Sequence, residues 1–364
     1  MELLRLNLVY GENNAGKSAF VRIPALLAAS RTPGRAGLDL GEPVRGAGFK
    51  EVQWRGPLPD EADPDLALGV GLSDGSTWRW TFRWLDSSAT SAIQRIELIS
   101  GNGRADVEIP RALAFDGLIP RPGLSALMDR HRDGLAGALD SVIWLEAKRE
   151  APAREGMPRG APGAFTSKGE GAAARVAADA KLRSAVSAWF HDHAGCRVEV
   201  ESLGSDRQRL VLEPPGASYA VPFPDAGEGL QQVFPVVAAL EHLRREGGLL
   251  CVEEPESHLH PRLERALAEL IVDVLCAQPA ASVLLETHSE VFLIAALTAA
   301  VDGLRGDVRL SWIETGKDGA ATIDDIALDA EGRPATPRME QAFETMGVMR
   351  RELIQARKLR SGAG

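Results

Sequence analysis

The sequence of 364 residues has little cysteine, no long uninterrupted apolar run and no excess of positive charge. Its three cysteines, Cys196, Cys251 and Cys276, lack metal-ligand spacing, so we expect reduced, buried thiols in a cytoplasmic protein. Charges and a proline interrupt the most apolar region, residues 266–301, so we expect no membrane span. A net charge of −10 argues against a surface that binds polyanions throughout, but leaves room for a local basic groove, so DNA stays open as a partner.

Near the N-terminus, the segment GENNAGKS fits the phosphate-loop pattern G-x-x-x-x-G-K-[ST]. The apolar run before it predicts a buried strand, and the residues after it have helical spacing. Glycine lets backbone N–H groups approach a phosphate, and a helix N-terminus favours the anion. Lys17 is expected to contact the outer phosphates and Ser18 to bind Mg²⁺. The candidate nucleotide-binding residues in this loop are Gly11, Asn13, Asn14, Ala15, Gly16, Lys17 and Ser18.

Strand-like runs separated by DGS and GNG turns predict an antiparallel β meander lobe at residues 50–112. Residues 151–171 are rich in Pro and Gly and predict a long loop, and residues 172–193 predict one helix. Residues 337–364 are expected to form a C-terminal helix and tail. Because the sequence has no internal repeat and no long heptad run, we predict a single domain over residues 1–364 with the lobe inside it.

Two acids, Glu253 and Glu254, directly follow the apolar run of residues 249–252. Paired acids at the carboxyl end of a parallel strand, beside a phosphate loop, suit nucleotide hydrolysis. We predict that Glu253 holds Mg²⁺ and that Glu254 orients or deprotonates the attacking water. The alternative is a solvated acidic turn.

Two further segments extend this pattern on either side of the paired acids. Gly227 and Gly229 precede a helical run, which predicts a second phosphate-binding turn or an ordinary helix start. His288 follows the strand-like run SVLLET and could contact the γ-phosphate or the water; the alternative is a histidine with a local hydrogen bond.

The order of these segments resembles the ABC class of ATPase heads, which includes SMC and RecF chromosome-maintenance proteins and OLD-type phage-defence ATPases. GENNAGKS resembles their Walker A, and DAGEGLQQ resembles the signature segment of stand-alone bacterial AAA-labelled ATPases. LLCVEEPESHLHP resembles Walker B and the D-loop, LLETHSE the switch-histidine region, and residues 312–332 the closing hairpin. The resemblance implies an α/β P-loop NTPase fold of ABC-ATPase head type, with a mostly parallel core sheet flanked by helices plus an antiparallel β lobe.

The resemblance also implies roles for individual residues. Lys17 and Ser18 would contact phosphate and Mg²⁺, with Glu253 as the Mg²⁺ carboxylate, and ATP and Mg²⁺ would be the cofactors. Glu254 would be the catalytic base and His288 the γ-phosphate sensor.

In such heads the signature segment completes the site of a second subunit. The resemblance therefore implies that Gly227, Gly229 and Gln232 face the nucleotide of a second copy, bound head to tail when ATP is present. Most heads have aspartate where Glu253 stands. The serine of the usual signature is missing from this segment, and Glu228 lies nearby instead. His258 and His260 fall in the D-loop position, which favours an interface or structural role over zinc binding.

The leading hypothesis is an Mg²⁺-dependent ATPase acting as an ATP-gated dimerising switch, in DNA maintenance or phage defence, with a separate effector protein. One alternative is the nucleotide-binding subunit of a membrane transporter; the EPE-x-HLHP segment and the long meander favour the stand-alone group. A second is an OLD-type nuclease-associated ATPase, although no nuclease module is visible after His288. A third is a module that holds ATP without hydrolysis, against which Glu254 argues.

Overall fold

The computed structural model describes residues 3–31, 37–46, 66–85, 90–109, 115–160, 163–304, 306–317 and 319–328. Its centre is a six-stranded sheet with strand order β16-β15-β1-β14-β13-β8. Five of these strands are parallel, and β16 pairs antiparallel with β15. The predicted α/β fold with a mostly parallel core sheet is confirmed. The strands are β1 (Leu6–Gly11), β8 (Val142–Leu145), β13 (Gly248–Glu253), β14 (Ala281–Glu286), β15 (Val308–Thr315) and β16 (Ala321–Ile326).

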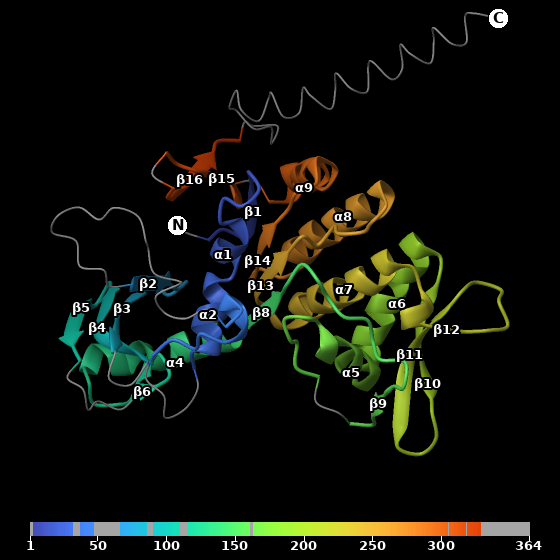
Figure 1. Cartoon of the computed structure of the whole chain (residues 1–364), viewed down its shortest axis with the longest axis horizontal. Coiled ribbons are helices and arrows are strands. Elements are labelled where there is room, and N and C mark those ends of the chain that lie inside the picture. The colour runs from blue at the N-terminus through green and yellow to red at the C-terminus, as the bar shows by residue number, and fades with distance from the viewer. Residues whose placement is uncertain are drawn as a thin grey trace, which may run out of the picture.

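Helices cover both faces of this sheet (Figure 1). One face carries α7 (Glu228–Glu246), α8 (Pro261–Ala277) and α9 (Glu290–Gly303), and the other carries α1 (Lys17–Val21) and α2 (Ile23–Ala29). Side chains of a strand alternate between faces. In β13, Leu250 and Val252 accordingly join the core under α7–α9, whereas Cys251 joins the core under α1 and α2. Burial on both faces explains why these strands read as continuous apolar runs.

An antiparallel four-stranded sheet forms a separate lobe beside α2, with its own core (Figure 1). The ladder runs through β2 (Leu66–Gly71), β3 (Thr77–Leu85), β4 (Thr90–Ser100) and β5 (Gly103–Glu108). Trp78, Trp80 and Phe82 point inward from β3 and pack with the buried residues of α4 (Ala126–Asp140). The antiparallel lobe is confirmed as part of the fold. Its predicted bounds, 50–112, stay a prediction, since residues 50–65 lie outside the described residues.

A third group of elements packs against α7 on the other side of the molecule (Figure 1). Its strands and helices are β9 (Met157–Pro158), α5 (Glu170–Ala178), α6 (Ala180–Ala194), β10 (Arg197–Ser202), β11 (Arg207–Glu213) and β12 (Val221–Pro222). The helix predicted over residues 172–193 is interrupted at Asp179. This residue is extended, and its carboxylate accepts hydrogen bonds from the backbone N–H groups of Lys181 and Leu182, so it caps a second helix instead of continuing the first.

Several smaller expectations meet different outcomes. Cys196 and Cys251 are buried, but Cys276 is exposed. The expectation of three buried thiols is therefore wrong for Cys276, which lies one residue before the end of α8.

In the predicted loop 151–171, the backbone oxygens of Ser167 and Lys168 accept hydrogen bonds from the backbone N–H groups of residues 146 and 150. This segment therefore runs back along the end of β8. Residues 337–364 lie outside the described residues. Among the described helices none is long and apolar enough to span a membrane.

Candidate active site

The predicted phosphate loop connects β1 to α1. Asn14 and Gly16 have positive φ angles of 62° and 94°, and Gly16 is the N-cap of α1. Ala15 is buried, whereas Asn13, Asn14 and Gly16 are exposed. Left-handed residues in such a turn point neighbouring N–H groups into a concavity that suits an anion. The loop therefore fits the phosphate group that its sequence predicts.

Gly11 is a glycine for a different reason from the one expected. Its φ is 146°, and a Cβ there would lie 2.1 Å from the backbone oxygen of Ile313 in β15. The close approach of β15 to β1 therefore requires glycine at this position. At Gly16, by contrast, the nearest atom to a Cβ would be the Ala321 methyl carbon at 3.7 Å, so space remains beside the loop.

Lys17 is buried and bonds to its own loop. Its Nζ donates to the backbone oxygens of Gly11 at 3.0 Å and Glu12 at 2.5 Å. Burial lowers the pKa of Lys17, while the carboxylates of Glu286, Glu254 and Glu12 raise it. These two bonds use two of the three N–H donors of the ammonium group.

Glu253, the predicted Mg²⁺ carboxylate, is enclosed by hydrogen-bond donors. Its Oε1 accepts from Arg22 Nε at 2.6 Å and from Trp144 Nε1 at 3.0 Å, and its Oε2 accepts from Arg22 Nη2 at 2.5 Å. The guanidinium carbon of Arg22 lies 5.5 Å from the Trp144 ring centroid. Only 2% of the Glu253 side chain is exposed. Bidentate pairing of this kind fixes both carboxylate oxygens.

Glu254 adopts a different position at the same strand end. Its φ is 42°, and its backbone N–H donates to Glu286 O at 2.9 Å. Ser257 Oγ donates to Glu254 Oε2 at 2.8 Å, and 37% of the Glu254 side chain is exposed. The carboxylate is thus held in one orientation and is open to water, as a base for water activation must be.

His288 lies between two carboxylates. Its Nε2 is 3.4 Å from Glu286 Oε1 and 3.8 Å from Glu254 Oε1. Burial raises the pKa of Glu286, which Glu253 raises further; a hydrogen bond from Ser18 and the charges of His288 and Lys17 oppose this. No motif in the sequence singles out Glu286, although this residue ends a buried strand as Glu253 does.

Glu256 holds the segment that carries His288. Its Oε1 accepts from Thr287 Oγ1 at 2.7 Å and from the backbone N–H groups of His288 at 2.9 Å and Ser289 at 3.2 Å. Burial raises the pKa of Glu256, which the bonds from Thr287 and the backbone oppose. In the sequence, Glu256 is the third acid of the segment EEPE, and that segment is the signal that could have indicated its role.

Arg149 connects α7 to the end of β13 from a buried position. Its Nε donates to Gln232 O at 2.8 Å, Nη1 to Glu146 O at 2.8 Å and Glu253 O at 2.9 Å, and Nη2 to Glu254 O at 3.1 Å. Burial lowers its pKa to about 10, against the opposing effect of nearby glutamates, so it stays charged at neutral pH. A single arginine at this position carries no signal in the sequence that could single it out.

The signature segment is only partly at the surface. Gly227 is the exposed N-cap of α7. Gln232 is 7% exposed: its Oε1 accepts from Arg149 N at 2.8 Å, and its Nε2 donates to Arg149 O at 2.7 Å. Both ends of the amide are thus used inside this chain, and the contact between Gln232 and a second subunit stays a prediction. A Cβ on Gly229 would lie 2.5 Å from His258 O, so close packing against the next loop requires this glycine.

The two D-loop histidines have separate local contacts. His258 Nε2 lies 3.5 Å from Glu228 Oε1, and His260 is the N-cap of α8, where its side chain accepts from Arg262 N. Within the described ranges, no three His, Cys, Asp or Glu residues group so as to hold a metal ion. A cation at the candidate active site would therefore need ligands from a bound nucleotide in addition to those of the protein.

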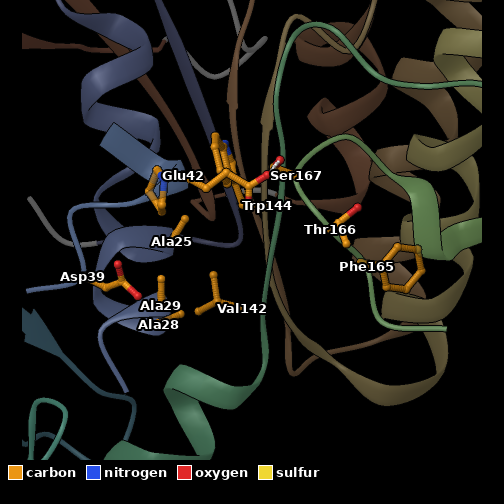
Figure 2. A pocket seen from close by; sticks show the side chains of 11 residues that line it. Ala25, Ala28, Ala29, Asp39, Glu42, Val142, Trp144, Phe165, Thr166 and Ser167 are labelled. Atoms are coloured by element: carbon orange, nitrogen blue, oxygen red, sulfur yellow. Dashed lines mark hydrogen bonds between the residues drawn. The ribbon is translucent and has the colours of Figure 1, made fainter. Parts of the chain in front are cut away.

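A pocket of about 360 Å³ lies beside the site, between α2, β8 and the segment 165–167. Figure 2 shows Trp144 and Glu42 near its upper end and Phe165 on the facing segment; Ser167 Oγ donates to the Glu42 carboxylate. Among the described residues that line it, none is a predicted site residue. Trp144 connects this pocket to the site, because its indole N–H bonds to Glu253.

Comparison with known proteins identifies the class of this domain. Residues 142–295 match the family described as "AAA domain, putative AbiEii toxin, Type IV TA system". The matched segment runs from β8 into α9 and includes Glu254 and His288 but not the phosphate loop. This match to a family labelled as an AAA domain confirms the recognition made from the sequence. ATP and Mg²⁺ are the general ligands of such domains.

Solved structures similar to the chain include SMC head domains. One is the SMC head domain from Thermotoga maritima, with 11% identity over 89% of this chain and 91% of that chain and a TM-score of 0.41. Another is the Smc head domain with an extended coiled coil from Pyrococcus furiosus, bound to the C-terminal domain of ScpA, with 11% identity over 94% and 93% of the two chains and a TM-score of 0.45. No curated protein matches the chain.

Proposed function

We propose that this protein hydrolyses ATP in an Mg²⁺-dependent reaction. The observation that supports this most is the convergence, at one edge of the sheet, of the loop that carries Lys17 with the strand ends that carry Glu254 and Glu286. The P-loop joins β1 to α1 at this edge, and His288 adds an imidazole within 3.8 Å of both acids. Phosphoryl transfer depends mainly on such positioning and charge stabilisation.

The roles follow from exposure and contacts. Glu254 orients a water molecule and accepts its proton, because its carboxylate is partly exposed and fixed by Ser257. Lys17 and Ser18 hold the phosphates and the ion, and His288 contacts the terminal phosphate. When bound, Mg²⁺ neutralises charge on the phosphate oxygens.

The test of this proposal measures Mg²⁺-dependent phosphate release. Wild-type protein is expected to turn over slowly, and Lys17→Ala to lose both nucleotide binding and turnover. Wild-type protein that binds ATP without releasing phosphate would leave a nucleotide-holding module.

We propose further that ATP drives two copies together, head to tail. Gly227 is the exposed N-cap of α7, whose helix dipole is favourable for an anion on the other copy. Substitution of Gly229 is a poor test, because its Cβ would collide with His258 O. At Gly227, no described atom lies within 4 Å of an added Cβ, and φ is −59°, which any residue adopts.

Gly227→Asp therefore adds a negative charge where the partner's phosphate would lie, and aspartate is a favourable N-cap, so α7 itself is not weakened. Gly227→Asn is the neutral control of similar shape. Light scattering of a hydrolysis-deficient Glu254→Gln protein is expected to show an ATP-dependent dimer that Gly227→Asp removes and Gly227→Asn retains. The same mass with ATP and ADP would exclude the ATP-gated dimer.

A role in DNA maintenance or phage defence, with a separate effector protein, is our proposal for the cellular process. The description of the matched family, which names a toxin of a Type IV TA system, supports the defence alternative. Phosphate release with and without duplex DNA separates a DNA-responsive ATPase from one controlled by a protein.

A further inference from the structure

The ends of β13 and β14 carry two glutamates at equivalent positions. Glu253 and Glu286 are register partners across the two parallel strands, and Glu286 also pairs with Val9 of β1. Because β14 lies between β1 and β13, Glu286 is one strand closer to the phosphate loop than Glu253 is. Neighbouring strands are separated by about 4.8 Å.

The two carboxylates differ in how many of their oxygens are hydrogen-bonded. Both oxygens of Glu253 are bonded to Arg22, and one is also bonded to Trp144. Moving this carboxylate toward a metal would leave the buried Arg22 guanidinium, whose side chain is 9% exposed, without its partner.

Glu286 is 96% buried as a side chain, yet within the described part of the chain its Oε2 has no hydrogen-bond partner. A buried, unbonded carboxylate oxygen is unfavourable unless a ligand pairs with it. The groups around it are those of the phosphate site: His288 Nε2 lies 3.4 Å from Glu286 Oε1, and the charges of His288 and Lys17 favour the ionised form of the Glu286 carboxylate.

We propose that Glu286, and not Glu253, is the carboxylate that faces the nucleotide-bound Mg²⁺ together with Ser18. Glu253 instead forms a permanent ion pair with Arg22 that ties the end of β13 to the junction of α1 and α2. This assignment rests on the proposed ATPase function and revises which acid serves the metal. It accounts both for the Glu253 carboxylate, whose oxygens are already bonded, and for Glu286 Oε2, which has no partner among the described residues.

The test uses Mn²⁺ as the probe, bound together with ADP and followed by electron paramagnetic resonance. Glu286→Gln is expected to weaken Mn²⁺ affinity at least about 10-fold while ADP binding in EDTA is unchanged. Glu253→Gln is the matched control and is expected to change Mn²⁺ affinity less than about 3-fold while lowering the melting temperature, because the Arg22 pair is lost.

The opposite pattern, in which Glu253→Gln loses Mn²⁺ and Glu286→Gln retains it, would overturn the assignment. If Glu253→Gln does not fold, anomalous scattering from Mn²⁺ in crystals of the wild-type ADP complex decides the question, with a bond from the ion to Glu286 as the expected result and a bond to Glu253 as the contrary one. Wild-type protein that binds no Mn²⁺ with ADP would reject the proposed ATPase itself, a distinct outcome.

Discussion

The strand-end site and the antiparallel lobe use charge in opposite ways. At the strand ends, Arg22, Arg149 and Glu253 are buried and hydrogen-bonded. In the lobe, the buried positions are aromatic and aliphatic, and the charges form a ladder between Arg104 and Glu97 on the exposed side of the sheet. One region is therefore ordered by buried polar contacts, and the other by apolar packing.

This difference indicates where function and stability depend on the same atoms. A buried charge that loses its partner is costly, whereas exposed pairs contribute little because water and salt screen them. Substitutions at the strand ends should therefore alter turnover, stability or both, and substitutions in the lobe should alter stability alone.

The largest effect is expected from Glu254→Gln. Removing the base should lower kcat by about 10³-fold, while ADP binding stays unchanged because the phosphate loop is intact. Single-turnover phosphate release and ADP titration measure the two quantities. Turnover at the wild-type rate would make another group the base.

Arg149→Met should lower the free energy of unfolding by about 3 kcal/mol, because four buried or partly buried backbone oxygens lose a charged donor. Urea denaturation without nucleotide measures this loss. Arg149→Lys keeps the charge but not the planar fork of donors. Its free energy of unfolding should therefore lie between those of the wild-type protein and Arg149→Met. An unchanged midpoint for Arg149→Met would show that this network is not stabilising.

His288→Ala should lower kcat about 10-fold and leave ADP affinity unchanged, because the proposed contact is to the phosphate that ADP lacks. Phosphate release and ADP titration are again the measurements. Equal losses of turnover and ADP binding would assign His288 a structural role beside Glu254 and Glu286.

Trp80→Phe tests the lobe core. The indole N–H of this fully buried residue donates to Leu118 O at 2.9 Å, so its loss should cost about 1 kcal/mol of stability. Turnover per folded molecule should not change. A large change in kcat would show that the lobe and the site are coupled, so that the lobe does not affect stability alone.

Arg104→Gln should have the smallest effect. Its side chain is 58% exposed, so loss of its pair with Glu97 should change neither the melting temperature nor turnover. A thermal scan at low and high salt measures it, and a clear shift at either salt concentration would show that the exposed ladder helps to hold the lobe together.

The sequence was sufficient for the mostly parallel core sheet and for the strands that lead into the phosphate loop, Glu254 and His288, because each of these segments has a local strand or loop signal. It was insufficient for the strand order, in which β14 separates β1 from β13. It was insufficient for Gln232 and Gly229, whose packing depends on Arg149 and His258, residues far from them in the chain. The helix break at Asp179 was readable in principle, since aspartate is a strong N-cap, but the apolar spacing continued through it.

The sequence by itself determined the class of domain and the edge of the sheet where its chemistry lies, because strand, loop and helix signals are local. Only the tertiary structure decided which buried acid is already paired. Glu253 and Glu286 each end an apolar strand and look alike in the sequence. Arg22 and Trp144 bond to one and not the other, since pairing between side chains on different elements depends on how the strands are ordered and how the helices pack on them.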